Sequence, residues 1–324
     1  MIRASIAALG LAASIAQAAP TTKWTITDIL PTWGGIAQGI NNRGEVTGWM
    51  YAPEPLPMHH AFIWSNGELR DLGTPPGHFS SSASGISNNG YIVGDGFNGY
   101  AAFWHNGQWT ALDTRGSFND VNESGTMVGG FYLPGNLDSH ATMYKDGVIT
   151  DLGTIGGGGW SGASAVNNSG TIVGNASLPT PPFSGLWIFR GFVYENGAMR
   201  DIGTLGGTSS YLYDINNSGT AVGCSDTAGG RLVATVYRNG VQQPLAEIPG
   251  NSCARAVNER GDVIGSSDSG GWLYANGVVT MLKDIPEVRA AGYTQLTPMA
   301  INDRGWITGT GSKNGGQSFV LMPR

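Results

Sequence analysis

The stretch Ile40-Asn41-Asn42-Arg43-Gly44-Glu45-Val46-Thr47-Gly48 decides the fold, because the chain repeats its pattern seven times. The pattern is an apolar residue, a polar pair, a glycine, and a short β-branched run that ends at a second glycine. The other copies span 86–94, 121–129, 166–174, 215–223, 257–265 and 301–309. Their internal glycines are 46, 35, 45, 49, 42 and 44 residues apart, and this period is typical of a repeat architecture.

Each repeat contains four short segments that are apolar at alternate positions and bounded by Gly, Asn or Asp, as β-strands are. The first segment ends at the Ile/Val-Asn pair, and the second is the run between the two glycines. The third carries an aromatic cluster such as 60–64, and the fourth ends near Asp-Leu-Gly-Thr, as at 71–74. Asn-Gly or Asp-Gly pairs between the last two segments, such as Asn66-Gly67, are strong hairpin signals. Each repeat is therefore predicted to be a four-stranded antiparallel sheet.

The two ends of the chain indicate how the repeats close. The last repeat stops at its third predicted strand, 318–321, whereas the segment 24–30 at the N-terminal end has the pattern of a fourth strand. We predict that this N-terminal strand completes the last sheet, which leaves no open edge there. The predicted fold is an all-β, seven-bladed β-propeller over 24–324, with four antiparallel strands per blade.

Residues 1–18 have the three regions of a secretory signal peptide: Arg3, an apolar stretch at 6–15, and the small-residue pattern Ala16-Gln17-Ala18. An ordered N-terminal helix is the alternative. We expect an exported protein, either extracellular or periplasmic, with no membrane span, because no later segment has ~20 continuous apolar residues. The formal charge of −6 and the absence of a Lys/Arg run argue against nucleic-acid binding.

The two cysteines, Cys224 and Cys253, favour a disulfide between neighbouring repeats, because an even pair in an exported chain is usually oxidised. Two buried thiols are the alternative. The five histidines share no metal-ligand spacing, so we expect no metal and no other cofactor. We also expect a monomer.

These motifs resemble the HAF-type extracellular repeats of bacterial secreted proteins over about residues 24–324. The resemblance is carried by His60-Ala61-Phe62 with Trp64, by Asp-Leu-Gly-Thr at 71–74 and 151–154, by Leu205-Gly206-Gly207 and by the repeated phrase. It implies export and a repetitive β architecture, but no established reaction. The sequence departs from the pattern in two ways: only His60 and His140 keep the histidine, and Ala111, Pro244 and Met281 replace the Asp of the fourth strand.

Long, varied connections at 49–59, 130–139, 175–190 and 285–297 are predicted to share one face of the molecule, opposite the tight turns. Variable loops on a rigid scaffold often bind ligands. Their aromatic side chains would stack on sugar rings or a peptide, or would instead fill blade interfaces or the channel mouth. The candidate ligand-binding residues are Trp49, Tyr51, His59, Phe131, Tyr132, Trp160, Phe183 and Trp187.

The repeated polar residues are interpreted as structural. Because Asp28, Asp71, Asp151 and Asp201 occupy one slot of the repeat, we expect them to accept backbone hydrogen bonds at strand ends. The asparagines of the phrase are interpreted as turn residues: Asn41, Asn122, Asn167, Asn216, Asn258 and Asn302.

The leading hypothesis for function is a secreted binding or interaction module for a surface glycan or a protein, which uses the long-connection face. We favour a binding protein over an enzyme and name no catalytic residue. One alternative is a polysaccharide hydrolase or lyase with carboxylates at the channel mouth. The other is a structural surface protein.

Overall fold

The structure is a computed structural model that describes residues 22–30, 34–52, 58–135, 138–179, 187–313 and 316–324. The predicted signal peptide, 1–18, lies outside the described residues. The described residues form an all-β molecule of 27 strands, whose ladders are all antiparallel. No helix among them is long and apolar enough to cross a membrane.

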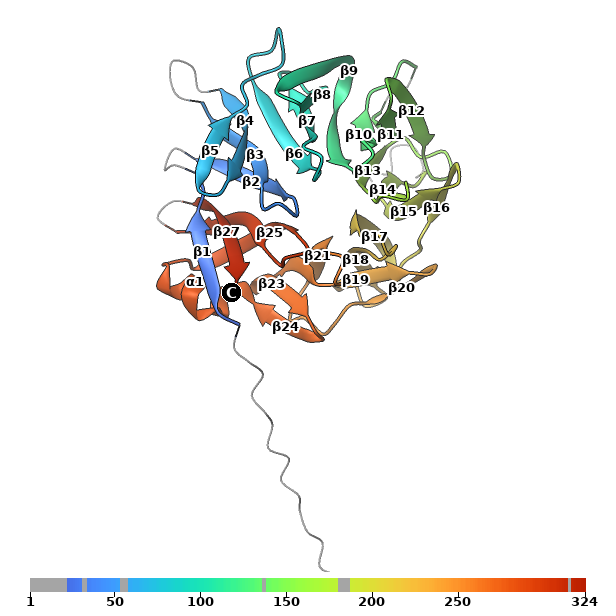
Figure 1. Ribbon diagram of the computed structural model, residues 1–324. Coiled ribbons are helices and arrows are strands. Elements are labelled where there is room, and N and C mark those ends of the chain that lie inside the picture. The colour runs from blue at the N-terminus through green and yellow to red at the C-terminus, as the bar shows by residue number, and fades with distance from the viewer. Residues whose placement is uncertain (1–21, 31–33, 53–57, 136–137, 180–186, 314–315) are drawn as a thin grey trace, which may run out of the picture.

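Figure 1 shows the sheets arranged around a common axis. Strands that follow one another in the chain are neighbours within each sheet. The first sheet consists of β2 (Gly35–Ile40), β3 (Val46–Tyr51), β4 (His59–Ser65) and β5 (Glu68–Asp71). The next has seven strands: β6 (Ser81–Ile86), β7 (Ile92–Gly96), β8 (Tyr100–His105), β9 (Gln108–Val121), β10 (Met127–Phe131), β11 (His140–Lys145) and β12 (Val148–Gly153).

The remaining sheets have four strands each. One consists of β13 (Ser161–Val166), β14 (Ile172–Ser177), β15 (Phe189–Glu195) and β16 (Ala198–Asp201). The next consists of β17 (Gly206–Ile215), β18 (Ala221–Thr227), β19 (Leu232–Arg238) and β20 (Val241–Pro244). Then follow β21 (Ser252–Val257), β22 (Val263–Ser267), β23 (Gly270–Ala275) and β24 (Val278–Met281). After a 3-10 turn at Leu282–Asp284 and the short helix α1 (Pro286–Ala290), the last sheet contains β25 (Gln295–Ile301), β26 (Ile307–Ser312), β27 (Gln317–Pro323) and β1 (Trp24–Asp28).

The N-terminal strand lies where the sequence predicted it. β1 pairs with β27 in antiparallel register from Trp24 opposite Pro323 to Asp28 opposite Phe319. Residues nearly 300 positions apart in the chain therefore share one sheet, and the N-terminal segment covers what would otherwise be the exposed edge of β27.

Seven strands lie nearest the axis, and we call β2, β6, β9, β13, β17, β21 and β25 the inner strands (Figure 1). Each inner strand contacts the next one, and β25 contacts β2. Strand β9 is unusually long because its first part pairs with β8 and its last part, from Gly116, pairs with β10. The shortest repeat spacing, 35 residues, leaves no room for a separate connection here, so one strand joins two sheet regions.

Each inner strand carries a β-bulge just before the repeated phrase. In β2 the register with β3 shifts between Ala37 and Gly39, which leaves Gln38 outside the pairing. The same shift recurs in the other six inner strands. We call the unpaired residues the bulge residues, and they are Gln38, Ser84, Asn119, Ser164, Tyr213, Arg255 and Met299.

The closing glycine of each phrase lies beside the bulge. A Cβ on Gly48 would come closer than 3.0 Å to the backbone oxygen of Ile36, so only glycine fits without a shift of the backbone. The same backbone clash would arise at the closing glycines of the other phrases: Gly94, Gly129, Gly174, Gly223, Gly265 and Gly309. The second glycine of the phrase is therefore required by close strand approach rather than by a turn.

The first polar residue of the phrase shapes its turn, as predicted. The Oδ1 atom of Asn41 accepts hydrogen bonds from the backbone N–H groups of Arg43 and Glu45, both at 3.0 Å. Its Nδ2 atom also donates to the backbone oxygen of Ser87 in the next turn. Equivalent bonds to the following turn are made by Asn122, Asn167, Asn216, Asn258 and Asn302. This asparagine is thus both a turn residue and a link between repeats.

The second polar residue of the phrase forms a complete circuit of hydrogen bonds. The backbone N–H of Asn42 donates to Oδ1 of Asn88 at 2.8 Å, and the backbone N–H of Asp303 donates to Oδ1 of Asn42 at 2.9 Å. The same kind of bond links each residue of this slot to the next one. We call these residues the turn circuit, and they are Asn42, Asn88, Glu123, Asn168, Asn217, Glu259 and Asp303.

The hydrophobic core lies between neighbouring sheets. Large aromatic side chains at the third-strand position are fully buried there, which explains the aromatic clusters of the sequence: Phe62, Phe192, Trp272 and Phe319. Each such burial stabilises the fold by roughly 1.5–3 kcal/mol. The predicted disulfide is present between Cys224 of β18 and Cys253 of β21, and in the chain-entropy model a loop of this length adds about 3–4 kcal/mol.

Candidate ligand-binding face and channel

The strand order separates two faces of the molecule. The turns of the repeated phrase and the Asn-Gly or Asp-Gly hairpins lie at one end of the sheets, which we call the tight-turn face. The connections between second and third strands, and between successive repeats, lie at the other end, which we call the long-connection face. The tight turns and the variable connections therefore lie at opposite ends of the sheets.

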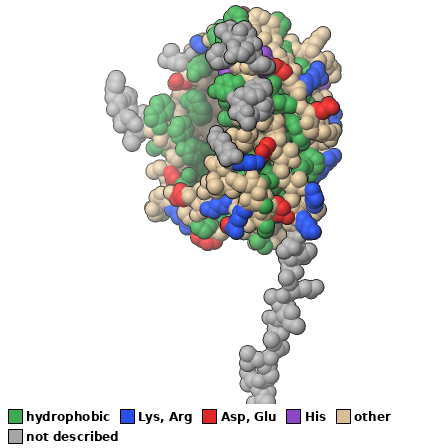
Figure 2. Space-filling model, turned by 90° about the vertical axis from the view of Figure 1, so that its left-hand side faces the viewer, with side chains coloured by type: hydrophobic (Ala, Val, Ile, Leu, Met, Phe, Trp, Pro, Cys, Tyr) green, Lys and Arg blue, Asp and Glu red, His purple; other side chains and the backbone are tan. Residues whose placement is uncertain are grey.

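Exposed aromatic side chains occur on the long-connection face. Tyr51, Phe79, Tyr132 and Trp187 are 43%, 63%, 57% and 68% exposed, and they come from four different connections or strand ends. Figure 2 shows hydrophobic side chains gathered at the left of its view, while Lys and Arg are scattered among acidic side chains. Exposed rings on one face offer apolar contact area to a ligand.

Three of the predicted binding residues form one cluster on this face. The Trp49 ring lies 5.5 Å from the Tyr51 ring in an edge-to-face arrangement, and 5.5 Å from the His59 ring. All three residues come from β3 and β4, which pair through Tyr51 opposite His59. The sequence prediction therefore joins residues that do lie together.

The other predicted residues have different outcomes. Phe131 is not available to a ligand, contrary to its selection as a binding residue: it is fully buried, because it ends β10 and its ring packs edge-on against Phe118 at 5.1 Å. Phe183 lies outside the described residues. Tyr132 and Trp187 are exposed, whereas Trp160 is half-buried against Phe189 with ring centroids 5.7 Å apart.

A continuous file of rings leads from Trp187 toward the axis. The Trp187 and Phe189 rings are stacked at 6.3 Å, and Phe189 lies 6.0 Å from Tyr211. Tyr211 stacks on Tyr213 at 6.2 Å with an interplanar angle of 9°. Tyr213 is a bulge residue of β17, so the file ends at the lining of the central cavity. We call Trp187, Phe189, Tyr211 and Tyr213 the aromatic file.

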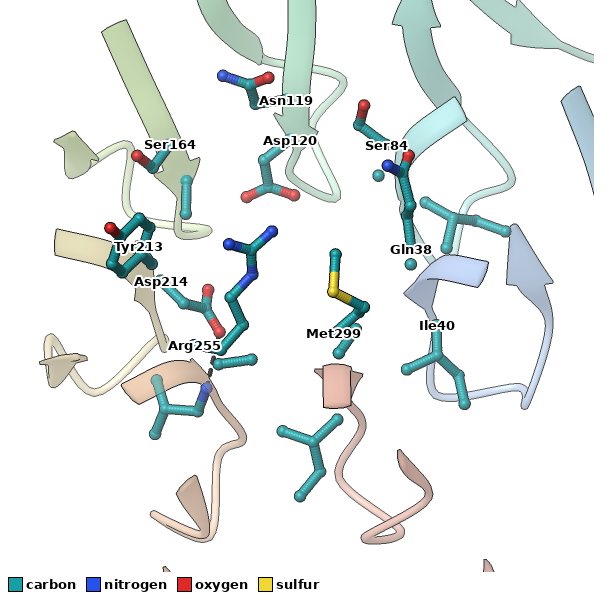
Figure 3. A pocket seen from close by; sticks show the side chains of 18 residues that line it. Gln38, Ile40, Ser84, Asn119, Asp120, Ser164, Tyr213, Asp214, Arg255 and Met299 are labelled. Carbon is teal, nitrogen blue, oxygen red and sulfur yellow. Dashed lines mark hydrogen bonds between the residues drawn. The ribbon is translucent and has the colours of Figure 1, made fainter. Parts of the chain in front are cut away.

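The inner strands enclose a cavity of about 510 Å³ on the axis, which is within the range of small-molecule sites. All seven bulge residues line it, together with the residues that follow them (Figure 3). Because the bulge removes these residues from strand pairing, their side chains are free to differ between repeats. They supply two amides, two hydroxyls, a phenol, a guanidinium and a thioether.

Two carboxylates lie at this level of the cavity. Asp120 accepts a hydrogen bond from the backbone N–H of Val166, and Asp214 accepts from those of Ile215 and Val257, at 2.8–2.9 Å. Burial raises the pKa of Asp120. Burial also raises the pKa of Asp214, and the neighbouring Asp120 charge adds to the rise, to about 7. Each carboxylate ties its own inner strand to the next one.

Arg255 is the one basic residue among those that line the cavity. In Figure 3 its side chain projects into the open space near Asp120 and Asp214. The guanidinium carbon lies 5.6 Å from the centre of the Tyr213 ring, and this charge opposes the rise that burial causes in the pKa of Tyr213. Within the described part of the chain, Arg255 forms no ion pair within 4.0 Å.

Three of the four repeated aspartates of the fourth strand accept backbone hydrogen bonds, as predicted. Asp71, Asp151 and Asp201 each accept a hydrogen bond from the backbone N–H two residues later. Asp28 differs: it accepts from the Tyr293 hydroxyl at 2.6 Å and from Lys313 at 2.8 Å. Burial opposes its ionisation, but these hydrogen bonds and the Lys313 charge lower the pKa of Asp28 overall. Among the described residues, no group of His, Cys, Asp and Glu is arranged to hold a metal ion.

Sequence reasoning missed the cavity residues Asp120, Tyr213, Asp214 and Arg255, and also Phe189 and Tyr211 of the file. A signal was available. The position two before the Ile or Val of each phrase holds six different residue types in seven repeats, from Ser and Gln to Tyr, Arg and Met. Variation at a fixed position of a repeat marks a side chain that the fold does not constrain.

No family model matches the sequence, and no curated protein matches it. Solved structures do match. An extracellular domain of a hybrid two-component system from B. thetaiotaomicron has a TM-score of 0.59 at 12% identity, over 92% of this chain and 39% of that one. The β-propeller domain of the Trilobed protease from Pyrococcus furiosus has a TM-score of 0.58 at 10% identity, over 89% and 95%. A puromycin-hydrolyzing peptidase from Mycobacterium tuberculosis has 0.58 at 12%, over 86% and 50%.

At these identities the likeness concerns the fold alone. The chain has a β-propeller-like fold, with antiparallel sheets around an axis. The Pyrococcus furiosus domain is described as having an open velcro topology, whereas in this chain the N-terminal strand β1 pairs with β27.

Proposed function

We propose that this protein is a secreted carbohydrate-binding module that holds a glycan on its long-connection face. The observation that carries the proposal is the aromatic file, which joins an exposed tryptophan to a polar cavity. Rings give apolar contact to sugar faces, and amide, hydroxyl and carboxylate groups give hydrogen bonds to sugar hydroxyls. A long glycan would lie along the file with one end in the cavity.

The proposal includes a fold of seven blades with four strands each, built from repeats of the HAF type. The seven inner strands, and the division of β9 between two sheet regions, support this count. Export is supported by the sequence pattern of residues 1–18 and by the disulfide. The extracellular domain from B. thetaiotaomicron is a structural neighbour that fits the same location.

The test is a binding screen of the mature protein against soluble oligosaccharides and insoluble cell-wall polysaccharides, followed by titration of any that bind. Trp187→Ala is expected to weaken binding by about tenfold, because it removes the exposed end of the file. Val278→Ala is the matched control, since Val278 is 60% exposed but follows a hairpin on the tight-turn face.

Binding that is lost in Trp187→Ala and kept in Val278→Ala would support the proposal. A screen in which no glycan binds, or equal losses in both variants, would reject it.

A polysaccharide hydrolase or lyase is the second candidate, favoured by the raised pKa values of Asp120 and Asp214 in one cavity. A protonated and an ionised carboxyl group are what glycoside hydrolysis requires. The hydrogen bonds of both carboxylates to backbone N–H groups favour a structural role instead. Release of reducing ends from bound glycans, abolished by both Asp120→Asn and Asp214→Asn, would establish the enzyme.

A further inference from the structure

We infer that the cavity at the inner end of the aromatic file binds the carboxylate of an acidic sugar, a uronic acid, through Arg255. The inference rests on the proposed carbohydrate binding and names the class of glycan. It makes the ligand a polyuronate or a glycan that ends in a uronate, in place of a neutral glycan.

Arg255 has no acidic partner within 4.0 Å among the described residues. Six other arginines form ion pairs with Asp or Glu: Arg43, Arg190, Arg200, Arg231, Arg260 and Arg289. Arg255 is one of six described arginines that have none, and it is the one whose side chain lines the central cavity (Figure 3). Its guanidinium has planar, fork-like donors that fit a carboxylate with two parallel hydrogen bonds.

The guanidinium of Arg255 also lies beside the inner end of the aromatic file. Tyr213 is both the last ring of the file and the ring nearest the guanidinium, at 5.6 Å. A sugar ring that stacks on Tyr213 would therefore bring a substituent within reach of Arg255. The contact between the cation and the ring also limits the freedom of the arginine before a ligand arrives.

Neutral polar side chains line the same cavity as the guanidinium. The Gln38 amide and the Ser84 hydroxyl line the same cavity, and neither side chain has a hydrogen bond within the described part of the chain. Asn119 and Ser164 complete the ring at this level. These groups suit sugar hydroxyls, which need both donors and acceptors.

The two carboxylates of the cavity repel an anionic ligand less strongly than two fully charged, unpaired groups would. Asp120 and Asp214 are held by backbone N–H groups of the strand walls, so their charges are partly compensated. The raised pKa of Asp214, about 7, leaves a large share of this group protonated near neutral pH. Glu259 of the turn circuit is the further acid that acts on Asp214, and Arg255 is the one cation of the cavity lining.

The experiment compares an oligogalacturonate with the same oligomer after its carboxyl groups have been reduced to alcohols, by calorimetric titration at pH 7 and low salt. The wild-type protein is expected to bind the acidic oligomer about tenfold more tightly, since one charge-assisted bidentate contact distinguishes the two. Arg255→Gln is expected to lose this preference and to keep the affinity for the reduced oligomer.

Arg70→Gln is the matched control. Arg70 also lies over a ring, Trp104 at 5.6 Å, and also has no ion pair among the described residues, but it belongs to the outer strand β5. Circular dichroism and thermal melting of both variants show whether they fold. The control is expected to retain the full preference for the acidic oligomer.

Equal affinity of the wild type for both oligomers would overturn the inference, and so would an unchanged preference in Arg255→Gln. Monomeric galacturonate provides a separate probe of the cavity alone. If neither oligomer binds but galacturonate binds in an Arg255-dependent way, the proposed glycan-binding face fails and the uronate site stands. If galacturonate and the acidic oligomer both fail to bind, the uronate site is rejected.

Discussion

Each position of the repeat has its own structural role. The asparagine of the phrase forms the turn, the closing glycine allows close strand approach, and the bulge residue faces the cavity. These three positions lie within eleven residues of each other, for example Gln38, Asn41 and Gly48. A substitution at each is therefore expected to affect a different property: turn geometry, strand packing or ligand binding.

Asp214 should make stability depend on pH. Its pKa is about 7 in the folded chain and 3.8 as an unperturbed group, so the folded state binds the proton more tightly. Its contribution is fully present below about pH 4 and is lost as the pH rises through about 7. Relative to Asp214→Asn, the wild type should lose of order 1–3 kcal/mol of unfolding free energy between pH 4 and 8.

Urea unfolding at several pH values measures this difference. Asp113→Asn, at an exposed position of β9, is the control for the loss of one carboxyl group outside the cavity. Parallel stability curves for the wild type and Asp214→Asn would contradict the assignment.

The sequence reveals residues that the repeat constrains far better than residues that it leaves free. Asn41, its equivalents and the three aspartates led by Asp71 were correctly assigned because they recur in one slot. Phe131 was misassigned because β10 continues two residues beyond the closing glycine of its phrase, so this ring lies in a paired strand and packs on Phe118 instead of standing in a connection. Asp120, Tyr213, Asp214 and Arg255 were missed because they converge only when strands distant in the chain meet at the axis.

At the level of elements, the inner strand and its hairpin partner form one unit defined by the bulge and the facing glycine. A Cβ at position 48 would clash with the backbone of β2, so the strand pair must move apart to accept it. Gly48→Ala is expected to destabilise the protein by about 1–3 kcal/mol, as overpacking does elsewhere. Denaturant unfolding of the two proteins gives this difference.

Gly229→Ala is the control for this substitution. Gly229 has no unusual φ, and its added Cβ would approach only the Thr227 hydroxyl, at 4.0 Å. A change within about 0.5 kcal/mol is expected there. Similar losses at both sites would show that the bulge does not impose the glycine.

For the whole molecule, strand closure and the turn circuit hold the first and last repeats together. The β1–β27 pairing acts at the outer edge of the last sheet, while the turn circuit acts near the axis. Between Asn42 and Asp303 there are two hydrogen bonds, one from the backbone N–H and one between side chains. These bonds join residues that no short connection links along the chain.

Asn42→Ala tests this closure. It removes both bonds to Asp303 and is expected to cost roughly 1–2 kcal/mol. Hydrogen exchange should then accelerate in β2 and β25, because the contact between these strands opens. Asn168→Ala removes an equivalent bond between covalently connected repeats, and its effect should remain near that turn. If faster hydrogen exchange stays confined to the local turn in both variants, the bonds between Asn42 and Asp303 have no special role in holding the first and last repeats together.

The overall architecture was largely predictable because it follows from local signals repeated many times. Hairpins at positions such as Asn66 and Asn106 take the left-handed conformation that Asn-Gly pairs favour. The pairing of β1 with β27 followed from counting strands at the two ends. The long strand β9 was not predicted, since a short spacing at 90–125 indicates a missing connection but not which strand continues through it.

The seven bulges also separate strand pairing from the lining of the cavity. Each presents one side chain to the axis without using it in strand pairing, so these positions can be varied without removing a turn residue or a ladder hydrogen bond. A combinatorial library over Gln38, Ser84, Asn119, Ser164, Tyr213, Arg255 and Met299 would therefore sample new ligand chemistries on a constant scaffold. The same independence lets single codon changes, one per repeat, alter the chemistry of the cavity lining.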